Sequence, residues 1–233
     1  QSLFLQSSTT LYLEKGCTLL GGTNRTDYPI LPVFSLPNEK DEHYLGLWEG
    51  NPLDSFAGLI NVINAENVTI TGEGTIDANA QNGDWYQNPK EKNIAWRPRL
   101  FFTSGAKNVV LHGVLVCNSY SWTITDHSEN VDILNIRIRN SSTSPTPTAS
   151  TRELQDVNII GNHVHVGDDC IALKSSKLFL GMKLHILENV IIRNCCLSRG
   201  HGGLVIGSEM SGGIKNVTVT QCLMDHTDRG LRV

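Results

Sequence analysis

A short step that recurs along this chain constrains its fold more than any other feature. An Asn followed by Val, or once an Asp followed by Val, opens a run of alternating apolar residues at intervals of 22 to 41 residues. Period-two alternation is the pattern of a strand, and repeats of this kind are typical of solenoids. The steps are Asn67-Val68, Asn108-Val109, Asn130-Val131, Asp156-Val157, Asn189-Val190 and Asn216-Val217.

The repeats contain no stripe with the 3.6-residue period of a helix, so the coils should be β-structure stacked into a solenoid. Each coil should point its alternating apolar side chains into the core, and each Asn should hydrogen-bond the equivalent Asn of the next coil. A β-sandwich with regular turns is the alternative fold. The expected core positions are Val109, Leu111, Val131, Ile133, Val190, Ile192, Val217 and Val219.

The pattern predicts a single domain over residues 1–233 that is interrupted twice. Residues 30–61 and 79–99 leave the coils as long loop excursions. Long loops on a rigid solenoid often shape a binding cleft. Aromatic residues of the second excursion could stack on the rings of a ligand or pack against the coils, and they are Trp85, Tyr86 and Trp96. The chain begins and ends within the pattern, which favours a domain truncated at both ends.

The composition excludes several classes of function. A net charge of −4 with no basic block argues against nucleic acid as a partner. No apolar run approaches the roughly 18 residues of a membrane-spanning helix, so we expect no membrane partner. The six cysteines show no CxxC pair and no zinc-ligand spacing, and we expect them as small buried hydrophobes. We expect neither a metal ion nor a cofactor.

The strongest local candidate for chemistry is Gly167-Asp168-Asp169. Adjacent strand residues point to opposite faces, but a turn or bulge at Gly167 would direct both carboxyls outward. Two close carboxyls raise one another's pKa, so one can donate a proton while the other stays ionised as a base. A polar corner of the coil and a calcium-ligand pair are the alternatives for these residues.

Two further candidates follow the acid pair along the chain. His201 lies between Gly200 and Gly202, where the absence of neighbouring side chains leaves the imidazole accessible to a ligand. Strand alternation places Arg232 on the face opposite Leu231, and an exposed guanidinium can bind a carboxylate through two hydrogen bonds. The acid pair, the imidazole and the guanidinium are about one coil apart, so a solenoid should stack them along one face.

These motifs resemble those of the family 28 glycoside hydrolases, whose best-known members are polygalacturonases. That family has Asn-Thr-Asp, Gly-Asp-Asp, Gly-His-Gly and Arg-x-Lys in this order along a right-handed parallel β-helix. Gly167-Asp168-Asp169 and Gly200-His201-Gly202 match without a gap, and Arg232 matches the Arg of the last motif. The likeness runs over nearly the whole chain, including GEGTIDANAQNGDWY, WRPRL and GHGGLVIGSEMSGG.

The resemblance implies an all-β fold, the right-handed parallel β-helix, and hydrolysis of α-1,4-linked galacturonan with inversion. Asp168 would be the general acid, and Asp169 would hold and deprotonate the attacking water. His201 would support the acid, and Arg232 would bind a galacturonate carboxylate. The partner would be pectin or an oligogalacturonide. Analogy favours a secreted or periplasmic location, and it leans towards exo rather than endo action.

One family motif is missing. Where relatives have Asn-Thr-Asp, this chain has Thr146-Pro147-Thr148 in an altered stretch over residues 146–155 that fits a shifted reading frame. Shorter stretches near 125–127 and 185–187 depart in a similar way. Compensated frameshifts and true divergence are the two explanations. With true divergence, one of two water-positioning carboxylates is lost.

Two other functions remain open from the sequence. A β-helix pectin lyase would eliminate rather than hydrolyse, and it would need a calcium site and a basic Arg or Lys. The Asp-Asp and His-Gly matches speak against it. A pectin-binding β-helix without turnover fits the altered residues 146–148. Detecting an unsaturated, ultraviolet-absorbing product would separate elimination from hydrolysis.

Overall fold

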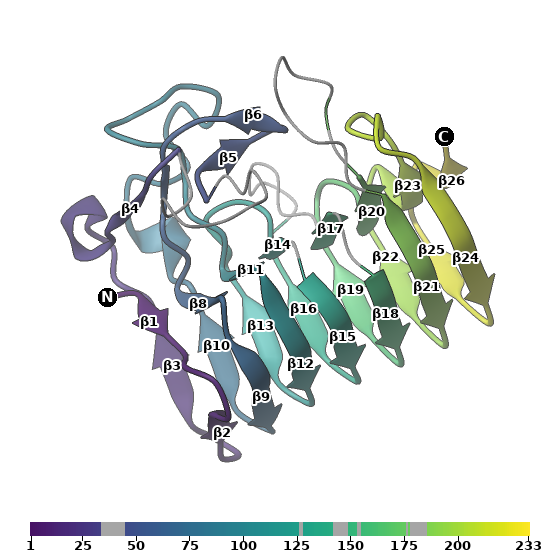
Figure 1. Cartoon of the computed structure of the whole chain (residues 1–233), viewed down its shortest axis with the longest axis horizontal. Coiled ribbons are helices and arrows are strands. Elements are labelled where there is room, and N and C mark those ends of the chain that lie inside the picture. Colours follow the sequence, from purple (N-terminus) through teal and green to yellow (C-terminus); the bar gives the residue numbers. More distant parts are fainter. Residues whose placement is uncertain (34–44, 126–127, 142–148, 153–154, 176, 178–185) are drawn as a thin grey trace.

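The chain winds through three parallel sheets and contributes one strand to each sheet per coil (Figure 1). The architecture is the right-handed parallel β-helix that the sequence predicts. A computed structural model describes residues 1–33, 45–125, 128–141, 149–152, 155–175, 177 and 186–233. In these ranges the helical elements are two 3₁₀ turns, η1 (Arg25–Asp27) and η2 (Ala80–Asn82). None of the described helices is long and apolar enough to cross a membrane.

Sheet A is the face on which the candidate catalytic motifs lie. Its strands follow one another in chain order, so each coil adds one parallel strand beside the last. They are β1 (Leu3–Phe4), β8 (Ile60–Ile63), β11 (Phe101–Ser104), β14 (Ile124–Thr125), β17 (Ala149–Arg152), β20 (Ile171–Lys174), β23 (Gly202–Ile206) and β26 (Arg229–Arg232).

Sheets B and C form the other two sides of the solenoid and have the same parallel order. Sheet B consists of β2 (Thr10–Leu13), β9 (Glu66–Gly72), β12 (Ala106–His112), β15 (Ser128–Leu134), β18 (Gln155–Ile160), β21 (Leu187–Arg193) and β24 (Ile214–Thr220). Sheet C consists of β3 (Thr18–Leu20), β10 (Thr75–Asp77), β13 (Leu115–Cys117), β16 (Arg137–Arg139), β19 (His163–His165), β22 (Cys196–Ser198) and β25 (Leu223–Asp225).

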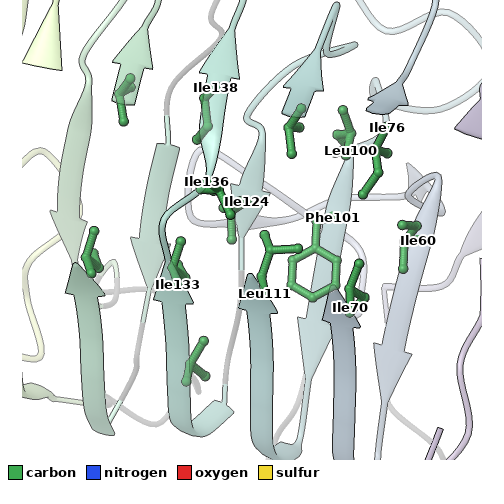
Figure 2. Packing of buried hydrophobic residues seen from close by; sticks show 14 of the residues in the cluster. Ile60, Ile70, Ile76, Leu100, Phe101, Leu111, Ile124, Ile133, Ile136 and Ile138 are labelled. Carbon is green, nitrogen blue, oxygen red and sulfur yellow. The ribbon is translucent and has the colours of Figure 1, made fainter. Parts of the chain in front are cut away.

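Apolar side chains fill the bore between the three sheets, as the alternation predicts. Leu111 pairs in register with Ile133, and both are at most 4% exposed. Figure 2 shows these two side chains from sheet B in the same bore as Phe101 of sheet A and Ile138 of sheet C. Burying each such side chain stabilises the fold by roughly 1.5–3 kcal/mol. Four more predicted core residues are equally buried, namely Val109, Val131, Val190 and Ile192.

Two predicted core residues share the register of the bore-facing side chains but are not fully buried. Val217 and Val219 lie on β24 in register with Val190 and Ile192. Val217 is only partly buried and Val219 is 37% exposed. β24 is at the edge of sheet B, and no strand among the described residues pairs with its far side. Alternation therefore sets the direction in which a side chain points, while its burial also requires a neighbouring coil on each side of the strand.

The expectation that the cysteines are buried holds only in part. Cys170 and Cys195 are buried, whereas Cys17 is exposed and the other three are intermediate. Burial raises the pKa of both buried thiols to about 11. These two side chains are therefore protonated, unreactive parts of the core at neutral pH.

The repeated Asn residues form a hydrogen-bonded column, here called the Asn ladder, at the corner where the chain passes from sheet A to sheet B. Asn108 donates to Asn67 over 2.9 Å, and Asn130 donates to Asn108 over 3.0 Å. All ladder residues have positive φ, between 53° and 58°, a conformation that Asn tolerates better than most residues. The predicted stacking is therefore confirmed. The ladder comprises Asn67, Asn108, Asn130, Asp156, Asn189 and Asn216.

The Asn ladder is interrupted at its one carboxylate. Asp156 accepts a hydrogen bond from Asn189 over 3.0 Å, and Asn216 donates to Asn189 over 3.0 Å. Asp156 is aligned with Asn130, because their neighbours pair across β15 and β18. A carboxylate has no N–H to donate, so the column breaks between these two residues.

The sequence predicts a long loop for the first excursion, but part of this excursion is regular β-structure. It forms two antiparallel pairs, β4 (Ile30–Leu31) with β7 (Ser55–Phe56) and β5 (Leu47–Trp48) with β6 (Asn51–Pro52). Glu49 and Gly50 join β5 to β6 with φ of 49° and 76°, and positive φ at both positions is what a type I′ turn requires.

Candidate active site

The acid pair lies at the corner where the chain passes from sheet C to sheet A. Gly167 and Asp168 form a bend, and Asp169 follows just before β20. The side chain of Asp169 is 16% exposed. Its Oδ1 atom is buried and has no hydrogen-bond partner in the described part of the chain. The predicted turn is present, and it presents a desolvated carboxylate oxygen that a ligand or water can satisfy.

His201 lies one coil further on, beside the acid pair. Its backbone N–H donates to the Asp168 carbonyl over 3.2 Å, and its own carbonyl accepts from Arg229 N–H over 3.2 Å. The imidazole is exposed. The sequence expectation of an unobstructed imidazole next to the acids therefore agrees with this placement.

The two positions beside His201 are glycines because any larger residue there would clash with its neighbours. A Cβ on Gly200 would come within 2.5 Å of the Asp168 carbonyl oxygen and 2.7 Å of Cys170 Sγ. A Cβ on Gly202 would come within 2.3 Å of Val205 and 3.2 Å of Asp169 Oδ1. Bare backbone at both positions is what allows this coil to approach the acid pair so closely.

Arg232 comes from the next coil again, on β26. It pairs in register with Val205, and its Nη1 lies 3.9 Å from Asp169 Oδ1. The guanidinium side chain is 50% exposed, so it remains open to a second anion. The four candidate residues thus lie on or next to three successive strands of sheet A, β20, β23 and β26 (Figure 1). Their chemical roles stay predictions.

The electrostatic environment of Asp169 is balanced between opposing effects. Burial, followed by the neighbouring Asp168 carboxylate, raises the pKa of Asp169 above its ordinary value. Arg232, Lys174 and His201 act in the opposite direction and lower it. The net increase means that ionisation of Asp169 is less favourable than that of a free aspartate.

An ion pair that the sequence analysis missed supports this site. Lys174 Nζ pairs with Glu209, and their side chains are 13% and 5% exposed. Glu209 also accepts from the hydroxyl of Ser208 over 3.1 Å. The sequence does indicate that Lys174 points out of the bore, because period-two alternation places it on the same side of β20 as Ala172, away from the buried Ile171 and Leu173. Its partner Glu209 lies 35 residues away, and no spacing pattern in the sequence links the two.

The β5–β6 turn reaches the same region from far away in the sequence. A Cβ on Gly50 would come within 2.7 Å of the Lys177 side chain and 3.0 Å of Glu209 Cγ. The first excursion therefore packs beside the ion pair that flanks the acids. This contact agrees with the expectation that long loops border the site.

The aromatic residues of the second excursion mostly pack rather than face solvent. Trp85 is fully buried, and its ring makes an edge contact with Tyr28 at 5.5 Å between centroids. Tyr86 donates its hydroxyl to the Ser119 carbonyl over 2.8 Å. Trp96 is half-buried and stacks on Trp48 at 4.6 Å. Packing against the coils is thus the role that these contacts support, most clearly for Trp85.

Much of the altered sequence falls outside the described residues. This applies to 126–127, 146–148, 153–154 and 185, which include the positions of the missing Asn-Thr-Asp motif. β17 begins directly after that motif and pairs Ala149 with Ile171 of β20.

Comparisons with known proteins agree with the fold and show the family. A family model described as glycosyl hydrolases family 28 matches residues 48–233. A probable polygalacturonase from Vitis vinifera is 28% identical, and the alignment covers 100% of this chain and 46% of the relative. An endo-polygalacturonase from Pectobacterium parmentieri is 27% identical, with 99% of this chain and 56% of the relative covered. The chain spans about half the length of these relatives.

Solved structures show the same fold. A family 28 exopolygalacturonase from Yersinia enterocolitica superimposes with a TM-score of 0.83 at 23% identity, covering 99% of this chain and 47% of the other. A hyperthermoactive exopolygalacturonase from Thermotoga maritima gives 0.80 at 26% identity, covering 95% and 55%. With the family model matching most of its length, this chain belongs to glycosyl hydrolases family 28.

Proposed function

We propose that this protein hydrolyses α-1,4-galacturonosidic bonds of pectin or polygalacturonate by an inverting acid/base mechanism. The observation that carries the proposal is the convergence of Asp168, Asp169, His201 and Arg232 from three successive coils of sheet A. Membership of family 28 and the polygalacturonase names of its relatives support the same substrate.

In this mechanism Asp168 protonates the leaving glycosidic oxygen, and Asp169 orients and deprotonates the attacking water. The buried Asp169 Oδ1 has no hydrogen-bond partner among the described residues, which suits an oxygen that holds a water. His201 supports Asp168, whose carbonyl it contacts through its backbone. Arg232 is half-exposed and can bind the carboxylate of a galacturonate unit.

The assignment of the general acid is a point on which the proposal can fail. In the free site burial and the Asp168 charge raise the pKa of Asp169. The resemblance assigns proton donation to Asp168 and activation of the water to Asp169. A substrate carboxylate that engages Arg232 would change this balance, since Arg232 lowers the pKa of Asp169 in the free site.

Binding without turnover is a second candidate function, and the sequence at Thr146-Pro147-Thr148 favours it. The family motif supplies a further carboxylate there to fix the direction of the water's attack. Without it Asp169 acts alone, and a misplaced nucleophile loses much of the advantage of orientation, of the order of 10² in rate for a displacement near 1 Å.

One experiment tests both candidates. Release of reducing ends from polygalacturonate is measured for the natural sequence and for a variant carrying Thr146→Asn, Pro147→Thr and Thr148→Asp, with one residue reinserted. If the altered stretch over residues 146–155 is true divergence, we expect slow or absent turnover in the first and recovery of roughly 10²-fold or more in the second. Equal rates would show that other residues supply the base, and a product with ultraviolet absorbance would indicate elimination instead of hydrolysis.

A further inference from the structure

The outer face of sheet C carries a basic groove that the proposed mechanism does not use. The groove has a volume of about 260 Å³. It is lined by Leu115, Arg137, Ile138, Arg139, His163 and His165, from β13, β16 and β19. His165 is three positions before Asp168, and the chain turns from sheet C to sheet A between them. The groove therefore lies on the face next to the candidate active site.

Four cation-forming side chains stand in a regular array on this face. Arg137 pairs in register with His163, and Arg139 pairs with His165. All four are exposed, while the residues between them, Ile138 and Val164, are buried. Neighbouring strands are about 4.8 Å apart and alternate residues of one strand are about 6.7 Å apart, so the four side chains mark the corners of a small rectangle.

The two guanidiniums are not neutralised within the described part of the chain. No ion pair or side-chain hydrogen bond joins Arg137 or Arg139 to another described residue. The outer face of sheet B differs, because Lys107 pairs with Glu129 at 3.0 Å and Lys215 with Glu188 at 2.6 Å. Lys107 and Lys215 of sheet B thus have acid partners on adjacent strands, whereas Arg137 and Arg139 of sheet C have none among the described residues.

The acids along the same column of sheet C already have partners. Asp77 accepts from Asn118 over 2.9 Å and from the Asn79 N–H over 2.7 Å. Asp225 pairs with His226 at 2.7 Å. Two exposed guanidiniums without acid partners on their own strand or the adjacent ones leave their N–H groups available to an external anion.

We propose that this groove binds the carboxylates of an acidic polysaccharide outside the candidate active site. The identity of the ligand as a galacturonan rests on the proposed function. Arg137 and Arg139 bind carboxylates of successive or nearby sugar units, each through two N–H groups, and the histidines donate from the adjacent strand. The half-buried Leu115 offers an apolar surface to the sugar ring. Such a site holds the polymer on the enzyme while another segment occupies sheet A.

The test measures binding without turnover. Retardation by polygalacturonate in a native gel at low ionic strength is compared in the Asp168→Asn background, with and without the double change Arg137→Gln and Arg139→Gln. We expect the double change to weaken the apparent affinity roughly three- to tenfold, and high salt should abolish the difference. The matched control is Arg193→Gln, an exposed arginine at the end of β21 in sheet B, which should leave retardation unchanged.

Kinetics separate the groove from the active site. In whichever form of the chain turns over polygalacturonate, the double variant should raise KM for the polymer and keep kcat/KM for a trigalacturonate, which is too short to occupy both sites. Unchanged retardation and unchanged KM would overturn the groove. The same loss of retardation on fully methyl-esterified pectin would equally overturn it, because that polymer has no free carboxylate to bind the guanidiniums.

Failure of the groove and failure of the proposed function are distinguishable. If no variant hydrolyses polygalacturonate but the double change still abolishes retardation, the groove stands and the hydrolase proposal fails. If the polymer is hydrolysed but never retards the protein, the hydrolase proposal stands and the groove fails.

Discussion

Two corners of the same coil show how one backbone repeat serves opposite purposes. At the corner between sheets A and B, the Asn ladder stacks neutral amides with hydrogen bonds of 2.9 to 3.0 Å. At the corner between sheets C and A, two carboxyls lie side by side, and Asp169 Oδ1 is buried with no hydrogen-bond partner in the described chain.

The difference lies in whether the polar groups are satisfied inside the molecule. A ladder amide has both a donor and an acceptor, so identical residues on successive coils satisfy one another. Carboxylates only accept, so stacking them raises a pKa and leaves an oxygen for an external partner. The first corner contributes stability to the solenoid, and the second contributes a reactive surface at some cost in stability.

The two corners should differ most when the same change, aspartate to asparagine, is made at each of them. We expect Asp168→Asn to lower polygalacturonate hydrolysis by roughly 10²–10⁴, because removing a general acid costs about that much. The measurement is the initial rate of reducing-end release relative to the parent, in whichever form of the chain turns over.

The matched control is Asp156→Asn in the Asn ladder. That change supplies the missing N–H towards Asn130 and completes the column, so we expect full activity and unchanged or slightly higher thermal stability. A similar loss of activity in both variants would mean that Asp168 acts only through the fold.

The ladder itself can be broken at its centre. Asn130→Ala removes one hydrogen bond between side-chain amides and forces an alanine into φ of 55°. We therefore expect a loss of about 1–3 kcal/mol in the free energy of unfolding. Asn130→Gly removes the same side-chain hydrogen bond, but glycine adopts this positive φ without steric strain. Denaturant unfolding of both variants separates the two contributions, and equal stabilities would show that the left-handed backbone carries no strain.

The smallest expected effect sharpens the contrast at the acidic corner. The folded pKa of Asp169 lies above its unfolded value, so its ionisation costs stability as the pH rises through that range. Asp169→Asn should therefore raise the Tm modestly at neutral pH, and the gain should vanish near and below the unfolded pKa of about 3.9. Melting curves over pH, with Asp156→Asn alongside, test this. A lower Tm at neutral pH would show that the Arg232 and Lys174 partners outweigh burial and repulsion.

Several features were predictable because they depend on local pattern. The inward direction of Leu111 and Ile133, the stacking of Asn108 on Asn67 and the convergence of His201 with the acid pair all follow from a fixed period and a fixed turn. The Lys174–Glu209 pair was not found, since no spacing rule links two residues on different coils with a loop between them. The β5–β6 hairpin was missed for a similar reason, because its interval lies outside the repeat.

The solenoid, its apolar bore and the order of the candidate site motifs can be predicted from the sequence, because alternation and repetition are properties of the chain read one coil at a time. The burial and charge pairing of polar side chains depend instead on how the coils pack. The burial of Asp169, the exposure of Val219 and the open guanidiniums of Arg137 and Arg139 depend on which strands lie on either side and what those strands carry. Solvent access and charge pairing are set by neighbours in space, and the period of the sequence does not encode them.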